Sequence, residues 1–190
     1  MKRPRRLTAF RLNPKETRII GYLLVSYSEL ELEMCRCLSE MLHGDRMLAV
    51  TLMFRLRGEE NRLQIMDAVL RPQFQNLRLL AEYDKIYSAV KRVKDIRNQY
   101  AHCQWDHTKK KGVLHFAKLE DIAKRNATKL TWRTTNLALL EYQESFFHFT
   151  FMCLYLLRKE IKTKREGKPS TRLAEDLQEL TEPPLYNAPA

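Results

Sequence analysis

Residues 77–102 read LRLLAEYDKIYSAVKRVKDIRNQYAH, and their apolar side chains recur with the period of an α-helix. These apolar positions share one face of the predicted helix: Leu80, Tyr83, Ile86, Val90, Val93, Ile96 and Tyr100. Such a stripe is typical of a helix that packs one side against a protein core. We therefore expect a long amphipathic helix from Leu77 to about Ala101.

The sequence before this stretch also favours helices, because Leu, Glu, Lys, Arg and Met dominate it. Asn13-Pro14 predicts the start of a first helix that runs to about His43-Gly44. Two shorter helices are expected over Asp45–Leu56 and Glu59–Leu70, and Arg71-Pro72 is expected to halt the second.

The composition changes after residue 101. Gln104–His107 and Val113–Phe116 flank the polar stretch Thr108–Gly112, which predicts a short β-hairpin. A last long helix is expected over about Thr135–Lys164, apolar almost all round in its second half, as in a central or shared element. The predicted fold class is therefore all-α: an up-down helical bundle of about five helices with a small β-hairpin insertion after the fourth helix.

The chain has 190 residues, enough for one domain with tails. We expect a basic flexible arm over residues 1–13, a helical domain over residues 14–165, and a loosely ordered tail with charged residues and prolines over residues 166–190. The 34 basic and 23 acidic residues give a formal net charge of +11. This excess favours a polyanionic partner, either nucleic acid or an anionic surface, although simple solubility would also account for it.

The four cysteines form no disulfide framework, so a reduced cytoplasmic protein is the natural interpretation. The apolar run Phe146–Leu157 is too short to span a bilayer, and we expect no membrane association. His102, Cys103, His107 and His115 lie near one another in sequence but match no strong zinc spacing, so we expect no metal site. No cofactor is expected either, because a phosphate-binding glycine loop is absent.

The sequence Arg97-Asn98-Gln99-Tyr100-Ala101-His102 closes the 77–101 helix with an arginine, a small polar residue and a histidine. Arginine stays charged and its planar fork fits phosphate oxygens, whereas histidine exchanges a proton near neutral pH. Residues five apart diverge by about 140° around an ideal helix, so Arg97 and His102 do not obviously meet within one helix. Either the helix ends by Ala101 and His102 swings round, or a second copy of the chain completes the site. A purely structural interpretation is also open, in which Arg97 interacts with the helix dipole and His102 caps free carbonyls at the helix end.

An arginine, a polar residue directly after it and a histidine four to six positions beyond the arginine resemble the motif of the HEPN superfamily (higher eukaryotes and prokaryotes nucleotide-binding domains). The specific match is Arg97, Asn98 and His102, and the similar layout covers roughly residues 14–165. The resemblance implies an all-α bundle with the motif toward the end of a long helix, and a composite site on the two-fold axis of a homodimer. Many HEPN proteins are metal-independent RNA endonucleases of toxin–antitoxin or phage-defence systems, and others only bind nucleotides or partners.

The resemblance assigns His102 as general acid/base and Arg97 as the cation that opposes charge on the phosphate. Asn98 would orient the histidine or hold a phosphate oxygen, and Asp95 would pin Arg97 or lie on a solvated face. RNA is the expected partner, and Trp105 is expected to stack a base or to pack in the core. The predicted RNA-binding residues are Lys2, Arg3, Arg5, Arg6, Trp105, Lys109, Lys110 and Lys111.

The expected function is thus a metal-independent RNA endonuclease of HEPN type, as in a toxin or phage-defence effector, with an antitoxin or another protein as a further partner. The alternative is a non-catalytic helical module that binds RNA, nucleotide or a protein partner. A plainer third interpretation is a structural dimerising bundle. The first two differ at His102, because catalysis needs its proton transfer and binding mostly needs the positive charges.

Overall fold

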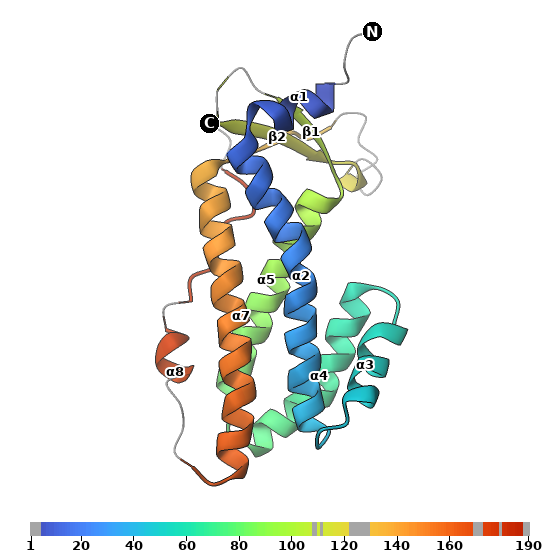
Figure 1. The fold of residues 1–190 in the computed structure, drawn as a ribbon, viewed down its shortest axis with the longest axis vertical. Coiled ribbons are helices and arrows are strands. Elements are labelled where there is room, and N and C mark those ends of the chain that lie inside the picture. The colour runs from blue at the N-terminus through green and yellow to red at the C-terminus, as the bar shows by residue number, and fades with distance from the viewer. Residues whose placement is uncertain are drawn as a thin grey trace. The chain divides into compact units, whose positions relative to one another are not determined.

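The computed structural model describes residues 5–107, 110, 112–121, 130–168, 173–178 and 180–187. Its helices are α1 (Arg5–Leu12), α2 (Pro14–Met41), α3 (Arg46–Arg55), α4 (Glu59–Asn76), α5 (Leu80–Ala101), α7 (Leu137–Arg165) and α8 (Leu173–Asp176) (Figure 1). Its strands are β1 (Cys103–His107), β2 (Val113–Lys118) and β3 (Arg133–Asn136), which form one antiparallel sheet in the order β1-β2-β3. The predicted helical class is confirmed, and no described helix is long and apolar enough to cross a membrane.

The chain divides into two compact units. The first unit comprises residues 1–27, 92–147 and 182–190, and therefore holds the sheet and the end of α5. The second unit comprises residues 28–91 and 148–181, and holds α3, α4 and α8. Each unit has its own buried apolar residues, such as Tyr100 and Phe116 in the first and Leu70 and Phe74 in the second.

The predicted helix boundaries agree with the structure at three points. α2 begins at Pro14, as the Asn13-Pro14 pair predicts. α2 ends at Met41, just before His43 and Gly44 adopt positive φ angles of 56° and 90°. Gly58 adopts a φ of 87° as the N-cap of α4, which separates α4 from α3. Glycine suits such a left-handed position because it has no Cβ atom.

The prediction that Arg71-Pro72 halts α4 was wrong. The helix continues through Pro72 to Asn76. Leu70 and Phe74 are both buried, and Phe74 stacks on Tyr83 of α5 with ring centroids 4.5 Å apart. This burial outweighs the loss of one helical hydrogen bond, because tertiary packing of an apolar face supplies most of a helix's stability.

The predicted hairpin is confirmed, with Trp105 of β1 opposite Phe116 of β2. The third strand was not predicted, since the last helix was expected to start at about Thr135. Thr135 instead pairs with Leu114 in the sheet and is fully buried. Its β-branched side chain suits a strand, and Asn136 then starts α7 by accepting a hydrogen bond from the Leu139 amide at 2.9 Å.

The basic arm expected over residues 1–13 is helical over α1, and residues 1–4 lie outside the described residues. Ala9 is fully buried, and the Phe10 ring lies 5.4 Å from the ring of Trp105. Asn13 donates to the Ala9 carbonyl at 2.9 Å and accepts from the Gly112 amide at 3.2 Å. Apolar packing and one bridging amide therefore fold this segment onto the hairpin.

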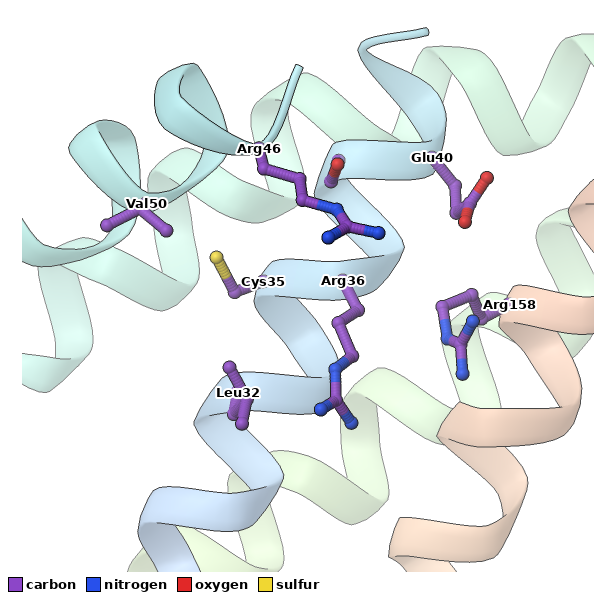
Figure 2. A pocket seen from close by; sticks show the side chains of 8 residues that line it. Leu32, Cys35, Arg36, Glu40, Arg46, Val50 and Arg158 are labelled. Atoms are coloured by element: carbon purple, nitrogen blue, oxygen red, sulfur yellow. The ribbon is translucent and has the colours of Figure 1, made fainter. Parts of the chain in front are cut away.

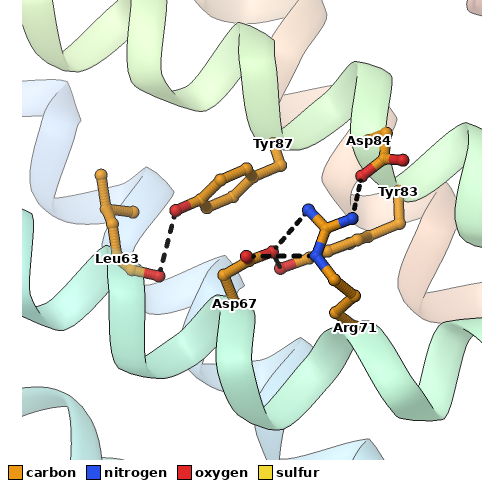
Figure 3. A network of polar contacts seen from close by, with 6 residues as sticks. All are labelled: Leu63, Asp67, Arg71, Tyr83, Asp84 and Tyr87. Atoms are coloured by element: carbon orange, nitrogen blue, oxygen red, sulfur yellow. Dashed lines mark hydrogen bonds and ion pairs between the residues drawn. The ribbon is translucent and has the colours of Figure 1, made fainter.

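Polar contacts between α4 and α5 order the second unit (Figure 3). Arg71 donates to Asp67 at 3.0 and 3.2 Å and to Asp84 at 2.7 Å. The Tyr83 hydroxyl donates to the same Asp67 carboxylate at 3.0 Å. Burial raises the pKa of Tyr83 far above its ordinary value, and the Asp67 carboxylate raises it further. The phenol therefore stays a hydrogen-bond donor across the physiological pH range.

The two tryptophans of the first unit provide a matched test of its core. Trp105 is 8% exposed and contacts Phe10, Tyr100 and Phe116, whereas Trp132 is 41% exposed. We expect Trp105→Ala to lower the free energy of unfolding by about 3–5 kcal/mol, the usual cost of removing a buried aromatic side chain. Trp132→Ala should change it by less than about 1 kcal/mol, as surface substitutions do. Urea denaturation followed by circular dichroism measures both, and equal losses would contradict the described packing.

Candidate active site

The Arg97–His102 motif lies at the end of α5, in the first unit. The Arg97 guanidinium is half-buried, donates to the Asn98 side-chain oxygen at 2.8 Å, and lies 5.6 Å from the centroid of the Tyr27 ring. A guanidinium over an aromatic face is attracted by the ring quadrupole. These two contacts hold the arginine in a defined direction before any ligand binds.

His102 follows the last residue of α5 and is exposed. Its backbone amide still donates to the Asn98 carbonyl at 3.3 Å, which continues the helical hydrogen-bond pattern by one residue. An exposed imidazole can reach a substrate from solvent, whereas Arg97 is held by Asn98 and Tyr27. The helix thus ends at Ala101, and the amide of His102 adds one further hydrogen bond of the helical pattern.

Two buried residues between Arg97 and His102 anchor the end of α5. The Tyr100 hydroxyl, in a side chain only 2% exposed, donates to Gln143 of α7 at 2.7 Å and lies 3.2 Å from the Thr135 hydroxyl. Burial raises the pKa of Tyr100 to about 12, so the phenol is protonated near neutral pH. Gln99 is fully buried and donates to the Leu185 carbonyl at 2.5 Å. Tyr100 is thus a core residue, as predicted.

Residues 182–187 form what we call the C-terminal strap. Arg92 donates to the Pro183 carbonyl at 2.6 and 2.9 Å, and Gln143 donates to the carbonyls of Pro184 and Leu185 at 2.8 and 3.2 Å. The Asn187 amide donates to the Thr134 carbonyl at 3.0 Å, beside β3. Part of the segment predicted as a loosely ordered tail is therefore held by the half-buried Arg92 and by the buried Gln99 and Gln143. The signal was present in the sequence, since Gln99 and Gln143 occupy apolar helix positions and a buried amide needs partners.

The other predicted residues lie in different environments. Asp95 is exposed, with its carboxylate 4.0 Å from the Lys94 ammonium. Of the two roles considered for Asp95, this position agrees with a residue on a solvated face. Lys110 is exposed near the hairpin turn. Trp105 is covered by aromatic rings, which leaves its own ring little surface for a base. Lys2, Arg3, Lys109 and Lys111 lie outside the described residues, as do the side chains of Arg5 and Arg6.

Cys103, which directly follows His102, is a poor candidate for a nucleophile. Its thiol donates to the Tyr100 carbonyl at 3.3 Å, and burial raises its pKa to about 12. A thiol with that pKa is almost entirely protonated near neutral pH, and the thiolate is the reactive form. In the part of the chain that the structure describes, no three His, Cys, Asp or Glu side chains gather closely enough to hold a metal ion.

The basic residues of the chain are concentrated in the unit that carries the motif. The first unit holds 18 of the 34 basic residues but only 8 of the 23 acidic residues, a formal net charge of +10. The second unit holds 16 basic and 15 acidic residues and is nearly neutral. The electrostatic attraction for a polyanion therefore belongs to the unit that contains Arg97 and His102.

Comparison with known proteins gives no match: no protein-family model, no curated protein and no solved structure is similar to this chain.

The C-terminal strap can be tested by truncation. Ending the chain after Thr181 removes the carbonyl partners of Arg92, Gln99 and Gln143. Each buried amide left without a partner costs about 1–3 kcal/mol, so the free energy of unfolding should fall by at least that amount. A chain that ends after Asn187 keeps all of these bonds and is the matched control. Urea denaturation and amide exchange at residues 97–101 measure the effect, and equal behaviour of the two truncations would show that the strap does not anchor α5.

Proposed function

We propose that this chain is a metal-independent RNA endonuclease of HEPN type, with the Arg97, Asn98 and His102 side chains as its catalytic centre. One observation carries the proposal: an arginine held by Asn98 and Tyr27 lies five residues before an exposed histidine, at an anchored helix end in a strongly basic unit. Many HEPN endonucleases belong to toxin–antitoxin or phage-defence systems, and a role as a toxin or phage-defence effector is part of the proposal.

The chemistry follows from the two side-chain types. His102 takes the proton from an RNA 2′-hydroxyl, whose oxygen attacks the adjacent phosphorus. The bond from phosphorus to the 5′-oxygen breaks, and the protonated imidazole of His102 gives its proton to that oxygen. Arg97 offers a fixed positive charge to the phosphate oxygens as negative charge builds on them. The products are a 2′,3′-cyclic phosphate and a 5′-hydroxyl end.

A homodimer completes this site in the proposal. Residues five apart diverge by about 140° in an ideal helix, and the His102 amide still bonds to the Asn98 carbonyl, so the proposal takes the two side chains from different copies. A two-fold axis beside the end of α5 would bring Arg97 of one copy toward His102 of the other. Within the proposal, the helices form the up-down bundle of HEPN proteins and the dimer encloses one composite cleft.

The charge distribution favours RNA as the substrate. A net charge of +10 on the motif-bearing unit attracts the phosphate backbone without reading its sequence. The buried Trp105 is not part of this surface, so we assign no base stacking to it. Lys110 is the lysine of the hairpin turn that the structure describes, and it is exposed.

Replacing His102 by Ala should abolish most cleavage. We expect the rate on single-stranded RNA to fall by about 10²–10⁴, the usual contribution of general acid/base catalysis, with RNA affinity nearly unchanged. Wild-type cleavage should survive EDTA, should leave cyclic phosphate ends, and should spare DNA, which lacks the attacking hydroxyl. His148→Ala is the matched control because His148 is also exposed but belongs to the second unit.

Arg97→Ala should impair both binding and cleavage, since one fixed charge serves substrate and transition state. Equal rates for wild type and His102→Ala would reject His102 as the catalyst. RNA binding without cleavage by any of these proteins would instead favour the non-catalytic module that binds RNA or nucleotide.

RNA affinity should fall steeply with salt, with a log–log slope of about −0.7 for each phosphate contacted on a single strand. Removing residues 1–4, which include Lys2 and Arg3, should make this slope shallower without changing the free energy of unfolding. The truncation stops there because Ala9, Phe10 and Asn13 pack on the rest of the first unit. Fluorescence anisotropy with labelled RNA at several salt concentrations measures the slope, and salt-independent binding would contradict an electrostatic interface.

A further inference from the structure

A cavity of about 400 Å³ lies in the second unit, among residues of α2, α3 and α7 (Figure 2). Its volume falls within the range of small-molecule sites in proteins. Arginines from all three helices line it: Arg36 from α2, Arg46 from α3 and Arg158 from α7. Three guanidinium groups at one cavity repel one another unless anions compensate them.

A buried carboxylate fixes two of these arginines. Glu33 is fully buried, and its two oxygens accept from Arg158 at 2.6 Å and from Arg36 at 2.9 Å. Each of these bonds uses one nitrogen of its guanidinium group, so further N–H donors remain on both arginines. Because Glu33 already holds both side chains, a ligand that binds them loses little conformational entropy on their account.

Arg46 supplies the uncompensated charge. It is the first residue of α3, is exposed, and has no ion-pair partner among the described residues. The cavity also contains Glu40, whose carboxylate is 3.4 Å from the Lys162 ammonium. Arg36, Arg46, Arg158 and Lys162 carry four formal positive charges against the two negative charges of Glu33 and Glu40, so the surroundings of the cavity are net positive. An anionic ligand would reduce this excess.

Part of the cavity wall is apolar. Leu32 of α2 is 45% exposed and Val50 of α3 is 42% exposed, although both are large aliphatic side chains. Cys35 lies beside them, and burial raises its pKa, so the thiol is uncharged near neutral pH. A ligand with an apolar body would cover this wall while its anionic group met the arginines.

We propose that this cavity binds a small organic oxyanion, a phosphate or carboxylate carried on an apolar body. The near-neutral charge of the second unit favours a single discrete anion over a polyanion such as RNA. None of the residues that line the cavity belongs to the unit with Arg97 and His102, so the site is separate from the proposed catalytic centre and does not depend on it.

Isothermal titration calorimetry with the full chain at low salt tests this site. Phenyl phosphate and benzoate carry both the anion and the apolar body, whereas inorganic phosphate and benzyl alcohol each carry one of them. We expect saturable binding of phenyl phosphate or benzoate, and weaker binding of both partial probes. Methyl resonances of Leu32 and Val50 should shift on titration, while those of Leu185 in the first unit should not.

Arg46 and Arg55, the exposed first and last residues of α3, give a matched pair of variants, and only Arg46 lines the cavity. Arg46→Met should weaken binding at least about tenfold, as expected for a lost charge-assisted hydrogen bond, and Arg55→Met should leave it unchanged. Neither arginine holds Glu33, so both variants should fold. No saturable binding to wild type, equal binding by the two variants, or equal affinity for a partial probe would overturn the proposal.

Discussion

The buried hydroxyl of Tyr100 connects α5, α7 and β3 in the first unit. This single phenol binds Gln143 of α7 and lies beside Thr135 of β3, while its ring contacts Trp105 and Phe116 in the sheet. Gln143 in turn directs its amide toward the C-terminal strap. A buried polar chain of this kind is stable only when each member is satisfied, so it selects one arrangement of helix end, strand and strap.

Arg97 and His102 lie in different environments near this helix end. Both lie within three residues of Tyr100, yet the arginine is half-buried and held by Asn98 and Tyr27, and the histidine is exposed. A phosphate-transfer site needs a cation that is already oriented before the reaction and an acid/base group that the substrate can reach. The second unit orders its cations differently, because the buried carboxylate of Glu33 accepts hydrogen bonds from Arg36 and Arg158, which both line the cavity.

Periodicity predicted the helices, and the polar stretch before Gly112 predicted the hairpin, because both signals are local. The continuation of α4 through Pro72 was missed, since it depends on the burial of Phe74 against Tyr83 of another helix. β3 and the strap were missed for the same reason: Thr135 and Leu185 find partners far along the chain. The motif at Arg97 could be located from sequence because its residues are neighbours in the chain. The cavity lined by Arg46 could not be predicted, because its residues come from three helices, α2, α3 and α7.

In the proposed dimer, Arg97 of one copy and His102 of the other act on the same phosphate. Co-expression of Arg97→Ala and His102→Ala chains tests it most directly, because a mixed dimer contains one intact Arg97–His102 pair between its chains. Random mixing makes half of the dimers mixed, with one of two pairs intact, so about a quarter of wild-type cleavage should return although each variant alone is inactive. A mixture of folded dimers that stays as inactive as its components would contradict the composite site.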